Sequence, residues 1–241
     1  MKLFKNVFVV FFSIVVMYTM CSFIYENVTG SGKMAQENRT VPAFSGIDVC
    51  CGIEVIVKSG SQSVSVNAED NVLPLVETEV KDNVLHIGYK NKVSLKTHKK
   101  VTVYVSAASI EKLYASSGSK LVCDEVIKGN KLIAKVSSGA DMKIAIGVDD
   151  FNCEASSGSN MQVSGKANSL WAEASSSGDI DAKNCPVSTA TTEASSGSNI
   201  TVNVSENLIA KASSGGDILY KGAVTKVNKK LSSGGSVKML N

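Results

Sequence analysis

The sequence predicts an all-β protein, a right-handed parallel β-helix-like solenoid of about 19 residues per coil behind an N-terminal capping β-region. Internal repetition in the C-terminal half is the first observation. Apolar and polar residues also alternate within each copy, as in Ile200–Val204, which is strand periodicity. Seven segments align on Ser-Ser-Gly (Ser-Ser-Ser once), and their last residues fall at positions 118, 139, 158, 177, 197, 215 and 234.

The copies also keep an apolar position in step, three places after the glycine column. A period of about 19 is too short for the helix pair of α-helical repeats. It suits a coil of two or three short strands joined by tight corners, for which serine and glycine are well suited. A disordered Ser/Gly-rich segment, the alternative, has no reason to keep such a column. The column consists of Leu121, Met142, Met161, Ile180, Ile200, Ile218 and Val237.

Residues 1–25 are predicted to be a signal peptide or a membrane anchor. An uncharged, mostly apolar run from Val7 to Tyr25 follows a positive start. The run is long for a signal peptide and just long enough to span a bilayer. Cys21 adds a third alternative, because it is a candidate for lipid attachment after cleavage. All three alternatives place the rest of the chain outside the cytoplasm, and residues 26–41 are predicted to be a tether.

Residues 42–108 show strand patterns without a visible repeat. Ile53–Val57 and Val64–Val66 flank a Ser/Gly turn, which predicts a hairpin. An open coil end exposes backbone edges, so we expect this N-terminal β-region to continue into the solenoid of residues 109–241 and to cap its first coil.

The order of the short motifs in this region, followed by the repeats, resembles a known family. The motifs are Phe44–Val49, Gly52–Val57, Lys81–Ile87 and Val101–Val105. Together with the repeated Ser-Ser-Gly-x-Asp/Asn-Ile, they are similar to the putative autotransporter-adhesin head domain, or GIN domain, of Bacteroidetes envelope proteins. The resemblance covers about residues 41–241. It implies an export signal, a β-helix-like body and a role in adhesion, and it brings no catalytic residues with it.

Composition and residue spacing argue against catalysis and against nucleic acid. The net charge is only +3, and Arg39 is the sole arginine. A serine nucleophile needs a base within reach, but the two histidines, His86 and His98, lie outside the repeats. Seven equivalent Ser-Ser-Gly copies favour a structural corner. Adjacent carboxylates such as Asp149 and Asp150 point apart on a strand, whereas a glycosidase needs two facing carboxylates.

Five copies carry Asp or Asn two places after the glycine column. A calcium ladder is one interpretation, but each coil would offer about one carboxylate where calcium takes six to eight oxygens. We therefore expect these side chains to bind backbone N–H groups at the corners. No cofactor and no metal-ligating residue is expected. The column consists of Asp141, Asn160, Asp179, Asn199 and Asp217.

The six cysteines show no disulfide framework and no zinc-binding spacing. Cys50 and Cys51 are adjacent, and in a strand they point to opposite faces. Cys123, Cys153 and Cys185 fall at different places within their repeats. We expect these side chains to act as small, buried apolar groups.

One lysine-rich segment is a candidate patch for an anionic partner, such as an acidic glycan or lipid headgroups. A solvated hairpin turn is the alternative. Trp171 is a single candidate for stacking on a sugar. The candidate patch consists of Lys90, Lys92, Lys96, Lys99 and Lys100.

These observations predict a non-catalytic, exported cell-envelope protein, a candidate adhesin that presents repetitive polar solenoid faces. The expected partners are a cell-surface glycan or protein, and the membrane through the N-terminal segment. Two alternatives stay open: a carbohydrate-active enzyme on the same scaffold, and a structural or regulatory periplasmic domain.

Overall fold

The computed structural model describes residues 26–90 and 93–240. The signal, anchor and lipid-attachment predictions, with Cys21, lie outside the described residues, as does Lys92. The described chain is almost entirely β-structure, with one short 3₁₀ helix, η1 (Leu73–Leu75). Within these two ranges, no helix is long and apolar enough to cross a membrane.

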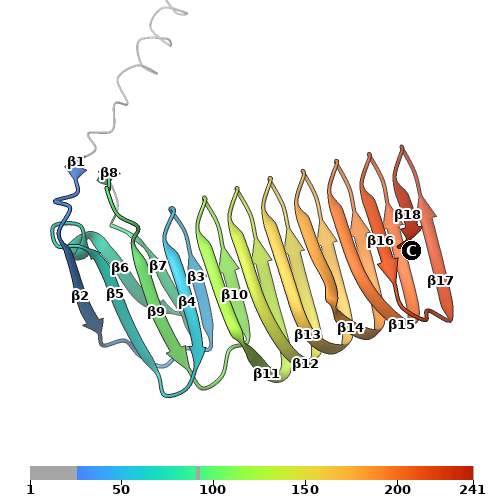
Figure 1. Cartoon of the computed structure of the whole chain (residues 1–241), viewed down its shortest axis with the longest axis horizontal. Coiled ribbons are helices and arrows are strands. Elements are labelled where there is room, and N and C mark those ends of the chain that lie inside the picture. Colours follow the sequence, from blue (N-terminus) through green and yellow to red (C-terminus); the bar gives the residue numbers. More distant parts are fainter. Residues whose placement is uncertain (1–25, 91–92, 241) are drawn as a thin grey trace, which may run out of the picture.

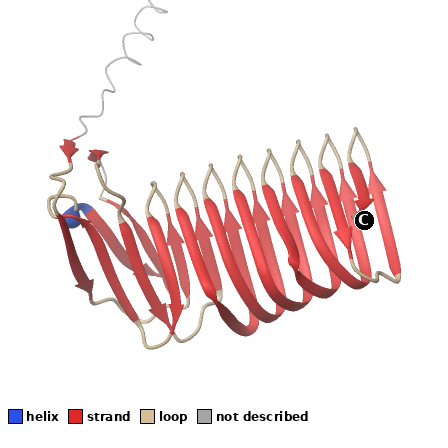
Figure 2. Ribbon diagram, viewed as in Figure 1, coloured by secondary structure: helices blue, strands red, loops and turns tan. Residues whose placement is uncertain are grey.

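The C-terminal part is a β-solenoid whose coils stack side by side along the long axis (Figures 1 and 2). Successive coils pair in parallel. The start of β11 (Lys120–Val136) pairs with β4 (Glu54–Ser59) and its end pairs with β10 (Lys112–Ala115), so one bent strand supplies both limbs of a coil. The predicted solenoid of seven repeats is confirmed. Its strands are β10 (Lys112–Ala115), β11 (Lys120–Val136), β12 (Asp141–Ala155), β13 (Asn160–Ala174), β14 (Asp179–Ala194), β15 (Asn199–Ala212), β16 (Asp217–Lys221), β17 (Lys226–Leu231) and β18 (Ser236–Met239).

The interior is filled by columns of apolar side chains, one from each coil. Every member of the predicted column from Leu121 to Val237 is buried. A second column, on the opposite limb, includes Leu132, Phe151 and Leu170, and each of these is at most 3% exposed. Because each coil buries these residues only against its neighbours, the stack is stable as an array and not as separate repeats.

The Ser-Ser-Gly segments are tight turns that form a ridge along one edge, visible as the row of pointed loops in Figure 1. In the first copy, Ser117 and Gly118 have φ of 53° and 69°, and the N–H of Ser119 donates to the carbonyl of Ser116. Two consecutive positive φ angles closed by this bond are the signature of a type I′ turn. The N–H of Gly118 also donates to the carbonyl of Ser138 in the next coil, at 3.0 Å. The predicted corners are therefore also joined to one another by backbone hydrogen bonds between successive coils.

An eighth turn of the same form precedes the seven repeats, at Cys50-Cys51-Gly52. It joins β3 (Gly46–Val49) to β4 (Glu54–Ser59), with φ of 67° at Cys51 and 75° at Gly52. Its Gly52 N–H donates to Ser117 in the next turn. Cys50 and Cys51 form a disulfide. Cys50 is half-buried and Cys51 is exposed. The expectation that they point to opposite faces as buried side chains is wrong, because the chain turns here.

The other three described cysteines behave differently from this pair. Cys123, Cys153 and Cys185 are buried free thiols, as predicted.

A further layer and antiparallel strands close the N-terminal end. β7 (Val84–Tyr89) and β9 (Thr102–Ala107) pair in parallel with β3 and β4. β6 (Val76–Lys81) adds antiparallel to β7, and β5 (Ser63–Glu69) adds antiparallel to β9. The predicted hairpin is wrong in its pairing, because β9 lies between β4 and β5 and pairs with both of them.

Residues 26–41, predicted to be a tether, contain two strands. β2 (Met34–Arg39) pairs antiparallel with β5 and covers an edge that would otherwise be open. β1 (Glu26–Thr29) pairs with β8 (Val93–Lys96). The buried carboxylate of Glu69 accepts the N–H groups of Gly32 and His98 at 2.6 and 3.1 Å. One carboxylate therefore fastens both segments to the cap.

Candidate functional site

The outer face of the second limb carries two parallel rows of polar side chains. Residues alternate inward and outward along a strand, so Lys211 and Ser213 face solvent on either side of the buried Ala212. Parallel register then aligns equivalent residues of successive coils. The charged row consists of Lys135, Glu154, Glu173, Glu193, Lys211 and Lys230. The serine row consists of Ser116, Ser137, Ser156, Ser175, Ser195, Ser213 and Ser232, the first serine of each turn.

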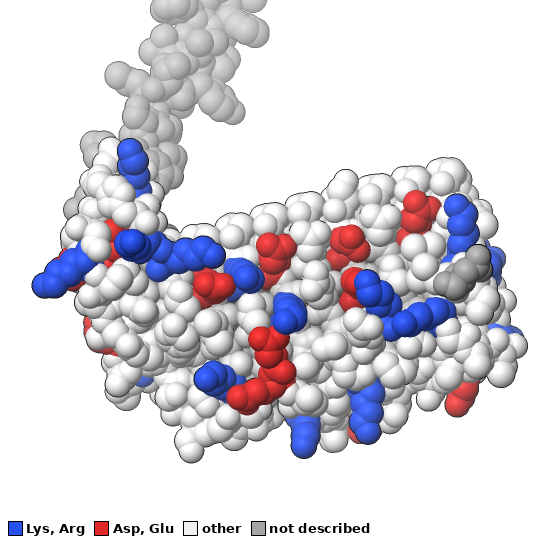
Figure 3. All heavy atoms as spheres, in the orientation of Figure 1, with Lys and Arg blue, Asp and Glu red and all other residues white. Residues whose placement is uncertain are grey.

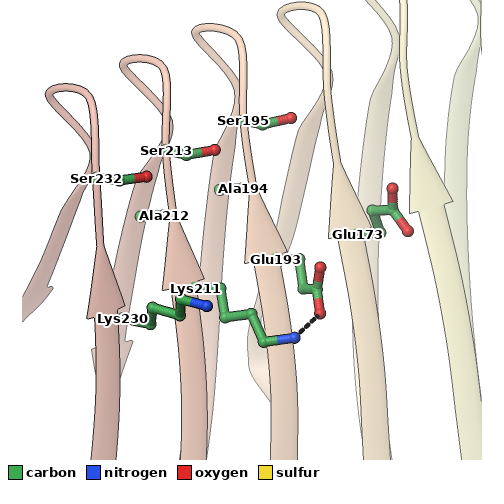
Figure 4. A pocket seen from close by; sticks show the side chains of 9 residues that line it. All are labelled: Glu173, Glu193, Ala194, Ser195, Lys211, Ala212, Ser213, Lys230 and Ser232. Atoms are coloured by element: carbon green, nitrogen blue, oxygen red, sulfur yellow. Dashed lines mark hydrogen bonds and ion pairs between the residues drawn. The ribbon is translucent and has the colours of Figure 1, made fainter.

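A hollow of about 230 Å³ lies between these rows toward the C-terminal end. In Figure 4 the Glu193 and Lys211 side chains meet below the serines, and Lys230 extends along the row toward Lys211. Neighbouring coils are about 4.8 Å apart, so the hollow offers charged groups and hydroxyls at a regular spacing. We call it the C-terminal hollow. It is lined by Glu173, Glu193, Ala194, Ser195, Lys211, Ala212, Ser213, Lys230 and Ser232.

Ion pairs occupy only part of the charged row. Lys135 pairs with Glu154 at 2.8 Å, and Lys211 pairs with Glu193 at 2.6 Å. Glu173 and Lys230 have no ion pair within the described part of the chain. Exposed pairs contribute little stability, at most about 1 kcal/mol each. The fold therefore does not need the row, and its two unpaired charges are available to a partner.

The same rows continue toward the N-terminal cap. Tyr114, Asp48 and His86 extend the charged row in register, and Cys50 extends the serine row. A second hollow of about 230 Å³ contains Asp48, His86, Cys50 and Ser116. This groove-like series is visible in the sequence only as Lys or Glu two places before six of the seven Ser-Ser pairs, a signal that sequence reasoning missed.

The second hollow brings together the residue types of a hydrolase without their geometry. His86 Nδ1 lies 3.0 Å from Asp48 Oδ2. Ser116 lies two coils from His86 along the stack, beyond hydrogen-bond reach at about 4.8 Å per coil. Cys50, which is closer, is held in its disulfide with Cys51. Neither Ser116 nor Cys50, among the residues that the structure describes, is therefore placed as a nucleophile against this histidine.

The Asp/Asn column lies on the outer face of the other limb. Its residues are in register, and Asn160 Nδ2 donates to Asp141 Oδ1 at 2.9 Å. The expected bond to a backbone N–H is wrong for Asn160, whose side-chain amide instead donates to the carboxylate of the preceding coil. Burial, with the charge of Asp181 as a smaller cause, raises the pKa of Asp179 above its ordinary value. Among residues 26–90 and 93–240, no three His, Cys, Asp or Glu side chains gather as metal ligands.

Four members of the lysine-rich patch, Lys90, Lys96, Lys99 and Lys100, are exposed in the structure. They lie beside β8, which fills the place that a Ser-Ser-Gly turn takes in later coils. Blue side chains gather at this end in Figure 3, whereas red and blue are interspersed along the rest of the face. Trp171 lies elsewhere, half-buried and two residues before Glu173 on the face of the charged row.

Fold and surface thus define a β-solenoid that is capped at its N-terminal end and presents rows of polar side chains. The profile of the family described as "Putative auto-transporter adhesin, head GIN domain" matches residues 43–224, which is most of the chain. The chain belongs to this family, and the predicted membership is confirmed. No curated protein matches it.

Several solved structures share the fold. A putative adhesin from Bacteroides fragilis has a TM-score of 0.83 at 17% identity, over 88% of this chain and 100% of that one. A putative adhesin from Parabacteroides distasonis has a TM-score of 0.74 at 23% identity, over 89% and 100%. A putative lipid binding protein from the same species has a TM-score of 0.66 at 18% identity, over 90% and 100%. The adhesin family implies an exported envelope protein.

Proposed function

We propose that this chain is a non-catalytic, adhesin-type interaction domain of the cell envelope, and that the charged and serine rows are its binding face. The observation that carries the proposal is the C-terminal hollow, where the unpaired Glu173 and Lys230 flank the Lys211–Glu193 pair beside three serine hydroxyls. Such an arrangement offers charge and hydrogen bonding to a ligand that spans several coils. Family membership supports the adhesin role.

The arrangement of the carboxylates also favours binding over hydrolysis. Glu154, Glu173 and Glu193 follow one another along one face, coil by coil. Glycoside hydrolysis instead needs two carboxyl groups on opposite sides of the scissile bond, about 5 to 9.5 Å apart. Carboxylates that project in parallel from one surface contact the same side of a ligand. They are suited to recognition and not to in-line chemistry.

Binding of the purified full-length protein to arrayed envelope and host-surface glycans and proteins tests the proposal. Replacing Glu173→Ala should weaken capture of the recognised partner. The control Glu206→Ala removes an exposed carboxylate outside the hollow and should leave capture unchanged. Equal capture by all three proteins would contradict the assignment of the binding face. Release of new reducing ends from a glycan, abolished by His86→Ala, would favour the enzyme instead.

Location can be tested separately on intact cells. An adhesin must be reachable from outside, so external protease should digest the domain while the cells remain sealed. Protection of the domain in intact cells, with digestion after lysis, would contradict adhesion. It would favour a periplasmic structural or regulatory role.

A further inference from the structure

The last coil carries an unbalanced positive charge. Residues 218–240 contain five lysines, Lys221, Lys226, Lys229, Lys230 and Lys238, and no aspartate or glutamate. None of these lysines forms an ion pair within the described ranges. The whole chain has a net charge of only +3, so the five lysines of this end leave the rest of the chain with a net negative charge. This end therefore attracts anions.

Lys230, one of these lysines, lines a hollow with hydroxyl groups. It shares the C-terminal hollow with Ser213 and Ser232. Its neighbour in the row, Lys211, is already neutralised by Glu193 at 2.6 Å. Figure 4 shows the Lys230 chain extended along the row below the serines, with no carboxylate drawn against it. An ammonium group and nearby hydroxyls are suitable donors to the two oxygens of a carboxylate.

The spacing of the rows favours a sugar chain over a peptide as the ligand. Coils repeat every ~4.8 Å along the stack. An extended peptide advances by only about 3.4 Å per residue, so its groups drift out of step with successive coils. Each sugar of an extended pyranose chain is longer than a peptide residue and closer to one coil spacing, so successive sugars can meet equivalent serine hydroxyls. The half-buried Trp171, on the same face, offers an apolar ring farther along.

The carboxylates farther along the row restrict where the ligand is charged. Glu173 and Glu193 lie on the next coils from Lys211 toward the N-terminal end. A polymer with an acidic group on every sugar would bring like charges onto Glu173. A single acidic sugar at the end of an otherwise neutral or amino-sugar chain avoids this repulsion. The row therefore discriminates between a terminal acid and a polyanion.

We propose that the C-terminal hollow binds a glycan that ends in an acidic sugar, with the sugar carboxylate held by Lys230, Ser213 and Ser232. This inference rests on the proposed function and names its ligand class. The following neutral sugars lie over the serine row toward Glu173. The lysine-rich patch at the opposite end of the molecule has no part in this contact.

The test compares ligands that differ only in charge. Titrations of full-length protein use sialic-acid- and glucuronic-acid-terminated trisaccharides, together with the same sugars after amidation of the carboxylate. The acid form should bind about tenfold more tightly than the amide, as expected for a charge-assisted hydrogen bond. Lys230→Ala should remove this preference. Lys226→Ala, which removes an exposed lysine of the same strand outside the hollow, should retain it.

Four outcomes would overturn the proposal. The first two are equal affinity for acid and amide, and no binding of any acid-terminated sugar. The third is an equal loss of the preference for the acid in the Lys230 and Lys226 variants. The fourth is Lys230-dependent capture of an acidic peptide with the same affinity as the sugar. If a glycan binds through Glu173 without any dependence on Lys230, the proposed function stands and only the acidic-sugar assignment fails. If nothing binds through the row, both fail.

Discussion

The ammonium group of Lys229 lies 5.1 Å from the centre of the Tyr220 ring. It also donates to the carbonyl of Val237 at 3.1 Å. Lys229 pairs in register with Ala210, whose side chain is fully buried in the interior of the coil before it. The last coil thus places a cation over the end of the apolar core. An inward-pointing charge at a free sheet edge opposes the addition of further strands.

Replacing Lys229→Val should therefore cause the protein to self-associate through its C-terminal end. Leu231 and Met239, 51% and 58% exposed, already lie at this end, and valine would complete an apolar edge. In analytical ultracentrifugation we expect the variant to form concentration-dependent end-to-end dimers and the wild type to sediment as a monomer. Lys226→Val removes the same charge from an outward position of β17 and should remain monomeric. A monomeric Lys229→Val protein would show that other features close this end.

The fourth turn is predicted to be a weak point of the ridge. Ser177 has φ of 61°, in the position where the other copies have glycine. A non-glycine residue in this region costs about 1–2 kcal/mol, partly offset by the greater chain entropy of glycine when unfolded. Ser177→Gly should stabilise the fold by about 0.5–1 kcal/mol in denaturant titrations. The reciprocal change Gly158→Ser should destabilise it by a similar amount. Effects of the same sign would contradict this account.

The next residue should respond in the opposite way. Gly178 is buried, and a Cβ there would collide with the backbone carbonyl of Ala155 in the preceding coil. Backbone cannot give way as a side chain can, so Gly178→Ala should cost roughly 1–3 kcal/mol of unfolding free energy. The same titrations measure this loss. A neutral result would mean that the coils separate locally without cost.

The double replacement Cys50→Ser, Cys51→Ser should preserve the fold. The seven Ser-Ser turns adopt the same sign of φ without a disulfide, and a bridge between neighbouring residues restricts the unfolded chain very little. The melting temperature should change by only about 2–4 °C, equivalent to about 1 kcal/mol for a chain of this size. Adding reductant to the wild-type protein is the matched control. A collapse of thermal stability in either sample would contradict the prediction.

The buried thiols should make stability fall at high pH. Burial raises the pKa of Cys123 to about 11 and that of Cys185 to about 11, from an ordinary value of 9.0. A raised pKa means that the folded chain favours the neutral thiol. This contribution to stability is complete below about pH 9 and is lost as the pH rises through 11. Thermal melts of wild type and Cys123→Ala, Cys185→Ala should therefore converge over that range. Rapid alkylation of either thiol in the native protein at pH 8 would contradict their burial.

The solenoid could be predicted because its signal is local and repeated. Leu121 and its six equivalents fall in step, so one column fixes both the period and the buried face. The turn at Cys50-Cys51-Gly52 was missed because cysteine replaces both serines, although the glycine and the following strand keep the pattern. The pairing of β9 between β4 and β5 depends on contacts far apart in the sequence. No local pattern predicts it.

The candidate site was harder to predict than the fold for a related reason. Glu173 and Lys230 are far apart in sequence and line the same hollow only because the coils stack. The Lys or Glu two places before six of the seven Ser-Ser pairs looks like ordinary surface charge when one repeat is read alone. The strands of residues 26–41 were missed because the local sequence gives no strand signal. β2 is mostly exposed and has no apolar alternation.

The ridge of turns suits the solenoid to peptide display. Each turn is held by the strands on either side of it, and the chain already accepts a longer segment, residues 90–101, where β7 and β9 would otherwise be joined by a short turn. Foreign loops grafted at several ridge positions would emerge in one line, about 4.8 Å apart per coil. The number of coils between two grafted loops would set their separation, so the number and spacing of epitopes in a multivalent display could be chosen.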